Sequence, residues 1–246
     1  MKLGCIASIL CAFLLSVPAW AKETATRSAF DYDGKSRTYY FFVPDVEGPL
    51  PVVLLLHGSG RNGLIMVEAW KKLASKEHFI VVAPDSYDSS NWDYRMDPPE
   101  FLHAVVEQVK ARHAIDESRI YLFGHSAGAC HALLLAILDS RYFVAVAVHA
   151  GALVPQNYPL LAYADRRMPI AIWAGSQDSY FPLDIVTATK KEFESHGFHV
   201  ELSVIPGHDH NYYEISDKVN SMAWDFLKKV QLRRTDAADE SQPATR

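Results

Sequence analysis

The stretch IYLFGHSAGACHALLLA, residues 120–136, sets an apolar run typical of a strand directly against an apolar run typical of a helix, with two glycines around one serine. A Gly-x-Ser-x-Gly turn between a strand and a helix is so sharp that the serine is strained and larger flanking side chains would clash. The turn projects the hydroxyl of Ser126 outward and places the first amides of the next helix, including that of Ala127, beside it. The motif therefore predicts a nucleophile at Ser126, against the alternative of an idle serine in a glycine-rich turn.

The rest of the chain alternates between strand and helix patterns. Around Asp33-Gly34, a two-residue turn signal, the pattern predicts an antiparallel hairpin from Ser28 to Val43. The run from Val52 to Leu56 is apolar at every position, as in a strand buried on both faces. Further strands are expected at 79–85, 119–124, 143–151, 168–176 and 199–207, with helices at 64–76, 98–113, from 127, at 183–196 and at 212–230. This order predicts an α/β fold with a mostly parallel sheet of about eight strands, helices on both faces and an antiparallel N-terminal hairpin.

The two ends of the chain differ from this core. Residues 1–21 hold one lysine, an apolar run from Leu3 to Val17 and the small-x-small site Ala19-Trp20-Ala21, so we expect a signal peptide cleaved after Ala21 and a secreted or periplasmic protein. About 15 apolar residues fall short of the ~20 that a membrane-spanning helix needs, so no membrane span is expected after cleavage. Residues 231–246 lack apolar periodicity and are expected to form a disordered tail, which leaves 22–230 as one domain.

Composition limits the classes of partner. The 246 residues are 49% hydrophobic, which suits one domain with a sizeable core. The formal net charge is −5 and no long basic cluster stands out, so neither nucleic acid nor an anionic membrane surface is expected as a partner. Only Cys130 remains after signal cleavage, so no intrachain disulfide is expected and this thiol is interpreted as buried packing.

Ligands of open parallel sheets bind at the carboxyl ends of the strands, so the residues that follow each strand are the functional candidates. Asp178 follows one strand, where a carboxylate can hold an imidazole in the right tautomer; a turn aspartate is the alternative, and Asp184 is a weaker candidate. His208 and His210 follow the next strand, and periodicity does not separate them. The chain order Ser, Asp, His is the one expected of this hydrolase arrangement.

Backbone groups and pocket residues complete the prediction. The turn after the first parallel strand can offer the amide of Ser59, which with that of Ala127 would hold a developing oxyanion. The expected pocket residues are His57, Trp92, Tyr94, His149 and Tyr212. His57 is interpreted as a structural hydrogen-bonding residue rather than a base.

Two further groups of polar residues receive structural interpretations. His125 is expected to be a packing or hydrogen-bonding neighbour of the turn, and His131 and Asp209 to be structural or solvated. The segment His208-Asp209-His210 resembles a zinc-ligand cluster in composition, but no third group of ligands accompanies it, so neither a metal nor a cofactor is expected.

Taken together, these segments resemble the α/β-hydrolase fold, and within it the family of secreted esterases that includes polyhydroxybutyrate depolymerase-like proteins and feruloyl and acetyl-xylan esterases. The likeness covers roughly residues 37–229. It is carried by RTYYFFVP, VVLLLHGSGRNG, FIVVAPDS, FLHAVVEQVKARHAIDESRIYLFGHSAGAC, AVAVHAG and WAGSQDSYFP. The segment PGHDHNYYEI is also similar to the Asp-His-Ser-Tyr-Tyr segment of the S-formylglutathione hydrolases, whose histidine there is the catalytic base. The resemblance thus favours His210 over His208 and implies Ser126 as nucleophile and Asp178 as its third partner.

This resemblance implies a serine hydrolase that cleaves small-molecule or oligomeric carboxylic esters through an acyl-enzyme and needs no cofactor. A departure is that Tyr212 stands where depolymerase-like relatives often have Trp-Pro. A peptidase or thioesterase with the same three residues is the alternative within the enzyme class. From a different class, the alternative is a non-catalytic binding protein on a hydrolase scaffold, against which the presence of Ser126, Asp178 and His210 argues.

Overall fold

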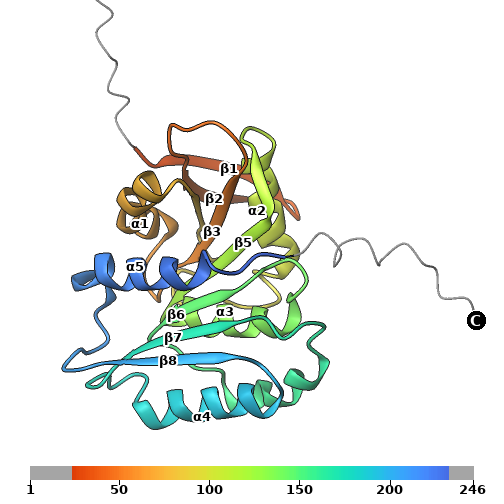
Figure 1. Cartoon of the computed structure of the whole chain (residues 1–246). Coiled ribbons are helices and arrows are strands. Elements are labelled where there is room, and N and C mark those ends of the chain that lie inside the picture. The colour runs from red at the N-terminus through yellow and green to blue at the C-terminus, as the bar shows by residue number, and fades with distance from the viewer. Residues whose placement is uncertain (1–23, 233–246) are drawn as a thin grey trace, which may run out of the picture.

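One eight-stranded sheet organises the protein, for which a computed structural model describes residues 24–232 (Figure 1). The strands are β1 (Thr26–Tyr32), β2 (Lys35–Phe42), β3 (Leu50–Leu56), β4 (Ile80–Pro84), β5 (Ile115–His125), β6 (Val146–His149), β7 (Ile170–Gly175) and β8 (Val200–Ile205). Their order across the sheet is β1-β2-β4-β3-β5-β6-β7-β8. The expected signal peptide, residues 1–21, and residues 233–246 of the expected tail lie outside the described residues.

The sheet is antiparallel only at its N-terminal edge. β1 pairs with β2 and β2 with β4 in antiparallel register. The remaining pairs, β4–β3, β3–β5, β5–β6, β6–β7 and β7–β8, are parallel. Asp33 and Gly34, which join β1 to β2, both have positive φ (52° and 70°), as the two central residues of a type I′ hairpin turn do. The predicted α/β fold, with its hairpin and its mostly parallel sheet, is therefore confirmed.

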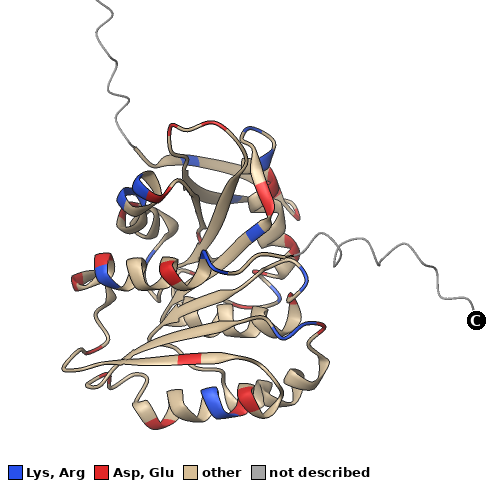
Figure 2. Cartoon of the chain, viewed as in Figure 1, with Lys and Arg blue, Asp and Glu red and all other residues tan. Residues whose placement is uncertain are grey.

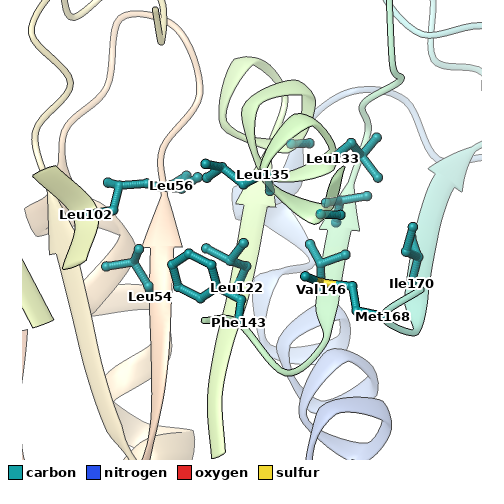
Figure 3. Packing of buried hydrophobic residues seen from close by; sticks show 14 of the residues in the cluster. Leu54, Leu56, Leu102, Leu122, Leu133, Leu135, Phe143, Val146, Met168 and Ile170 are labelled. Carbon is teal, nitrogen blue, oxygen red and sulfur yellow. The ribbon is translucent and has the colours of Figure 1, made fainter. Parts of the chain in front are cut away.

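Helices cover both faces of the sheet. They are α1 (Gly63–Glu77), α2 (Pro99–Lys110), α3 (Ala127–Leu138), α4 (Leu183–Ser195) and α5 (Ser216–Leu227). Residues of α2, α3 and α4 belong to one hydrophobic cluster and residues of α1 and α5 to the other. On β3, Leu54 and Leu56 join the first cluster, shown in Figure 3, while Val53 and Leu55 join the second. Successive strand side chains point to opposite faces, so an all-apolar strand serves both cores.

Charged residues avoid the centre of the sheet. Strands β3, β4, β6 and β7 contain none. The charged residues of β5, Asp116, Glu117 and Arg119, precede its apolar run from Ile120 to Phe123, and the others lie on helices, loops and strands β1, β2 and β8 (Figure 2). A charge between two apolar layers would lose its hydration without a compensating partner. No helix within residues 24–232 has the length and apolarity needed to cross a bilayer.

Four segments differ from the sequence-based expectation. β5 begins at Ile115, because Leu50 pairs with it before the register shifts to Val52 and Ile120. The expected helix 212–230 is a short 3₁₀ turn, Tyr212–Glu214, followed by α5. The 3₁₀ segment Pro155–Tyr163 was not expected, since its two prolines hide any helical period. Past Val230, the amide of Leu232 donates to Ser118 O (3.0 Å), so the described chain continues in contact with the domain beyond the expected boundary.

Candidate active site

Loops from four strands meet at one edge of the sheet. β3, β5, β7 and β8 run parallel, so their carboxyl ends lie on the same side, and the segments after them carry the polar residues expected from the sequence. This is the edge at which open parallel sheets bind their ligands.

Ser126 occupies a strained turn between β5 and α3. Its φ and ψ are 56° and −120°, a conformation that residues other than glycine rarely adopt. The flanking glycines permit the turn, because a Cβ on Gly124 would lie 2.3 Å from Gly128 O and a Cβ on Gly128 would lie 2.2 Å from Leu56 O. The amide of Ser126 donates to His149 O on the neighbouring strand (3.1 Å), which ties the turn to β6.

His210 lies between Ser126 and Asp178. Its Nε2 is 2.9 Å from Ser126 Oγ, and its Nδ1 is 2.8 Å from Asp178 Oδ2. A neutral imidazole that donates from Nδ1 to the carboxylate presents a bare Nε2 to the hydroxyl, which is the arrangement a general base needs. Periodicity left His208 and His210 unseparated and the resemblance favoured His210; the structure brings His210 to Ser126.

Asp178 is held in its ionised form. The side chain is fully buried, and its Oδ1 accepts from the amides of Tyr180 (2.8 Å) and Phe181 (3.0 Å) while Oδ2 accepts from His210. Burial alone would raise the pKa of Asp178, but the hydrogen bonds from His210 and from the two amides outweigh it, so the pKa lies below its ordinary value.

The weaker candidates take structural places. Asp184 lies in the first turn of α4, where its Oδ1 accepts from the amide of Ile185 (2.9 Å). Its negative charge stabilises the helix by interacting with the positive end of the helix dipole. The His208 carbonyl accepts from the amide of Gln177 (2.9 Å), and its ring packs 5.3 Å from that of His149, centroid to centroid. Neither residue has a hydrogen bond to Ser126 among the described contacts.

His57 and Trp92 fix the turn after β3. His57 Nδ1 donates to Gly58 O (2.9 Å) and its Nε2 accepts from the amide of Ser86 (3.1 Å), which defines a neutral tautomer; burial also lowers its pKa. Trp92 Nε1 donates to the His57 carbonyl (2.8 Å). The amide of Arg61 donates to Gly58 O (3.2 Å), so a tight turn surrounds Ser59 and leaves it exposed beside Ser126.

A cavity of about 460 Å³ opens over Ser126. It is lined by Gly58, Ser59, Arg61, His125, Ser126, Tyr180, Asp209, His210, Asn211 and Tyr213. The five residues expected to line a substrate pocket are absent from this lining, so that expectation was wrong for this cavity. His57, Trp92, His149 and Tyr212 are buried, and Tyr94 lies on an exposed loop that does not reach it.

Tyr212 shows why a buried aromatic near a catalytic loop can be mistaken for a pocket residue. Its hydroxyl accepts from Trp70 Nε1 (2.9 Å) and donates to Asn220 Oδ1, which anchors the loop to α1 and α5. Its neighbour Tyr213 faces the cavity instead, with the Arg61 guanidinium 5.3 Å from its ring centroid.

Sequence reasoning assigned no role to four residues of the cavity wall, which are Arg61, Tyr180, Asn211 and Tyr213. Tyr180 is 74% exposed and its ring centroid is 4.7 Å from that of His210, while Phe181 packs at 5.8 Å. Their position directly after Asp178 was the available signal. Across residues 24–232, no three His, Cys, Asp or Glu side chains are grouped so as to hold a metal ion.

Comparisons with known proteins identify the family of the chain. The family model described as the dienelactone hydrolase family matches residues 38–231. The chain is similar to a poly(3-hydroxybutyrate) depolymerase of Ralstonia pickettii, with 25% identity over 75% of this chain and 45% of the relative. It is also similar to a poly(3-hydroxyalkanoate) depolymerase of Paucimonas lemoignei, with 31% identity over 41% of this chain and 28% of that protein. The chain thus spans less than half the length of these curated relatives.

Solved structures share the fold at low sequence identity. An S-formylglutathione hydrolase of Staphylococcus aureus superposes with a TM-score of 0.71 at 15% identity, covering 83% of this chain and 98% of that one. A ferulic acid esterase of Anaeromyces mucronatus gives 0.69 at 18% identity, covering 84% and 90%. With the match over residues 38–231, these findings establish that the chain belongs to the dienelactone hydrolase family and has the α/β-hydrolase fold.

Proposed function

We propose that this protein hydrolyses carboxylic esters through a covalent acyl-enzyme on Ser126. The observation that carries the proposal is the position of His210, hydrogen-bonded to Ser126 Oγ at 2.9 Å and to Asp178 at 2.8 Å. Nucleophile, base and orienting carboxylate at hydrogen-bonding distance form the unit that acyl transfer requires. The family, whose relatives include depolymerases of polyesters, supports the same reaction class.

The proposed reaction has two steps. In the first, Ser126 Oγ attacks the ester carbonyl carbon while His210 Nε2 takes the hydroxyl proton, and the amides of Ser59 and Ala127 donate to the oxyanion. Collapse of the tetrahedral intermediate breaks the bond to the alcohol, which leaves with the proton held by His210. In the second, His210 takes a proton from water, the water oxygen attacks the acyl carbon, and the acid is released from Ser126 as the proton returns to it.

Asp178 stabilises the charged form of His210 in both steps. Its lowered pKa keeps it anionic at neutral pH, and the amides of Tyr180 and Phe181 hold it in place. It stays ionised throughout and transfers no proton itself.

The substrate is proposed to be a small or oligomeric ester. The cavity is open and polar at its rim, with Arg61, Asp209 and Asn211 beside the aromatic rings of Tyr180 and Tyr213. Such a site admits the end of a chain as readily as a free small molecule.

Steady-state hydrolysis of short p-nitrophenyl esters tests the proposal. Ser126→Ala and His210→Ala are expected to lower kcat by at least about 10³-fold, whereas His208→Ala retains activity. Loss of activity in His208→Ala with retention in His210→Ala would contradict the assignment of the base. A panel of acetyl, butyryl, feruloyl and 3-hydroxybutyryl esters then ranks the acyl groups.

We also propose that the protein is exported, with residues 1–21 as a cleaved signal peptide. Intact-mass measurement of protein recovered from an exporting host is expected to give an N-terminus at Lys22. A mature mass that still includes Met1 would contradict this.

A further inference from the structure

His125 is a buried histidine to which the proposed reaction gives no role. It is the last residue of β5 and lies opposite His149, the last residue of β6, in the parallel register. The two rings face each other through their Nδ1 atoms, which are 3.1 Å apart, and their centroids are 5.2 Å apart. A hydrogen bond at this distance needs one nitrogen with a hydrogen and one without.

Both imidazoles of the pair are neutral. Burial lowers the pKa of His149 to about 3 and that of His125 well below its ordinary value, and the neighbouring histidines add to the effect. A neutral imidazole carries one hydrogen, on either Nδ1 or Nε2. The position of the hydrogen in the Nδ1 pair therefore decides which nitrogen of each ring is protonated.

His149 fixes this choice through its other nitrogen. His149 Nε2 is buried and has no hydrogen-bond partner among the described residues. A buried N–H without an acceptor is among the rarest defects of native structures, so the hydrogen is better placed on Nδ1 of His149. His125 Nδ1 lies 3.4 Å from the His149 carbonyl, a longer contact than its 3.1 Å to His149 Nδ1, and that carbonyl also accepts from the amide of Ser126 at 3.1 Å. His149 Nδ1 then donates to His125 Nδ1.

This assignment leaves His125 with its hydrogen on Nε2. The Nε2 edge of the ring faces Gly58, since a Cβ on Gly58 would lie 3.1 Å from His125 Cδ2 and 3.5 Å from its Nε2. The same Cβ would lie 3.2 Å from the Cβ of Ser126. His125 lines the cavity together with Gly58, Ser59 and Ser126, and no described residue accepts a hydrogen bond from its Nε2.

We propose that His125 is a further catalytic residue, whose Nε2–H donates to the substrate's carbonyl oxygen as that oxygen becomes negative. The proposal rests on the proposed function, because it adds a side-chain donor to the oxyanion amides of Ser59 and Ala127. A donor in place before the reaction stabilises charge that develops only in the transition state. Removal of one such donor typically lowers kcat by about 10²–10³-fold.

The alternative is that His125 only packs against the catalytic loop, and the experiment must distinguish this role from that of a hydrogen-bond donor. The His125 ring lies 5.1 Å from that of His210 and 5.0 Å from that of Tyr212, so any substitution disturbs the loop that carries the base. Asparagine places its amide nitrogen near the position of imidazole Nδ1, whereas glutamine places it near that of Nε2. His125→Asn thus keeps a group toward His149 and loses the donor to the cavity, while His125→Gln does the reverse.

The test compares these two variants in kcat, in KM and in inhibition by a trifluoromethyl ketone, which forms a tetrahedral adduct with a serine nucleophile. We expect His125→Asn to lose about 100-fold in kcat with KM changed less than about threefold, and to bind the ketone correspondingly more weakly. His125→Gln is expected to keep kcat within about tenfold of the wild type. Equal losses in both variants, or a greater loss in His125→Gln, would overturn the proposal.

A second pair of variants, at His149, tests the proposal without substituting His125, so it does not depend on whether the His125 variants fold. His149→Asn retains an N–H toward His125 Nδ1, and His149→Phe removes it and with it the bond that fixes the tautomer. We expect His149→Phe to lose at least about tenfold more in kcat than His149→Asn, and equal values in the two variants would overturn the proposal. Fluorophosphonate labelling of Ser126 in the wild type tests the proposed nucleophile separately. If Ser126 is not labelled, the proposed function itself fails. If Ser126 is labelled but the paired variants have equal kcat, only the donor role of His125 is refuted.

Discussion

At the scale of single residues, the site holds a strained nucleophile. A non-glycine residue at φ 56° and ψ −120° costs on the order of 1–3 kcal/mol, and Ser126 keeps this conformation because β5, α3 and the bond to His149 O determine it. Strain of this kind is retained where a side chain must project from a tight turn. It also has a measurable consequence for stability.

We predict that Ser126→Gly is more stable than Ser126→Ala by about 1 kcal/mol, because glycine relieves the strain and alanine keeps it. Both variants lack the hydroxyl and are expected to be inactive, so activity is not a confounding factor. Urea unfolding of the two proteins measures the difference. An alanine variant as stable as the glycine variant would show that the turn stores no such strain.

A second residue-scale prediction concerns the carboxylate. Asp178→Asn keeps Oδ1 as an acceptor for Tyr180 and Phe181 but offers His210 an amide, which favours the wrong imidazole tautomer, so kcat is expected to fall by about 10³–10⁴-fold. Asp184→Asn is the matched control, since Asp184 bonds only at the start of α4 among the described contacts. Comparable losses in both variants would contradict the role of Asp178.

At the scale of elements, the helix after the nucleophile packs directly on a strand. The Cα of Gly128 lies so close to the end of β3 that an added Cβ would be 2.2 Å from Leu56 O and 2.7 Å from His57 O, both of them backbone atoms. Neither atom belongs to a flexible side chain that could move away. The glycine thus sets how closely α3 approaches β3, and with it the depth at which Ser126 is placed.

We therefore predict that Gly128→Ala lowers the free energy of unfolding by about 1–3 kcal/mol and reduces kcat, because α3 must shift away from β3. Leu138→Ala, at the C-terminal end of the same helix and 37% exposed, is the control, with a much smaller effect expected. Thermal unfolding and ester hydrolysis report the two consequences. A Gly128→Ala protein with wild-type stability would contradict this packing.

The sequence predicts the strands and turns of the fold better than it predicts the residues that line the site. The all-apolar strand at β3, the Asp33-Gly34 turn and the Gly-x-Ser-x-Gly junction each have a local physical signature, so the sheet and its hairpin were predictable. The choice between His208 and His210 depends on the path of a loop, which no periodicity encodes. The pocket was mispredicted for the same reason: Tyr212 and Tyr213 are adjacent, yet one turns into the core and the other into the cavity.

At the scale of the whole molecule, buried neutral histidines connect folding stability to pH. His57, His125, His131 and His149 are buried, and burial lowers the pKa of each, that of His131 to about 4. As pH falls below about 6.5, the unfolded chain binds protons that the folded chain does not, so stability decreases toward the folded pKa. Between pH 6.5 and 4, His131 alone accounts for about 3 kcal/mol of this loss.

His131→Gln tests this dependence, because glutamine can keep the donor to Asp97 O without titrating. The slope of unfolding free energy against pH between 6 and 4.5 is expected to become shallower by about 1 kcal/mol per pH unit. His199→Gln, whose side chain is 70% exposed, should leave the slope unchanged. Urea midpoints at a series of pH values provide the measurement, and an unchanged slope in His131→Gln would contradict the buried neutral state.

The central claim for the molecule is that Ser126 forms the covalent intermediate. Its most direct test is to treat the protein with a fluorophosphonate, then locate the adduct by intact mass and peptide mapping. We predict one adduct per chain, on Ser126 in the segment Gly124-His125-Ser126-Ala127-Gly128, and none in Ser126→Ala. An adduct on another residue, or one that persists in Ser126→Ala, would contradict it.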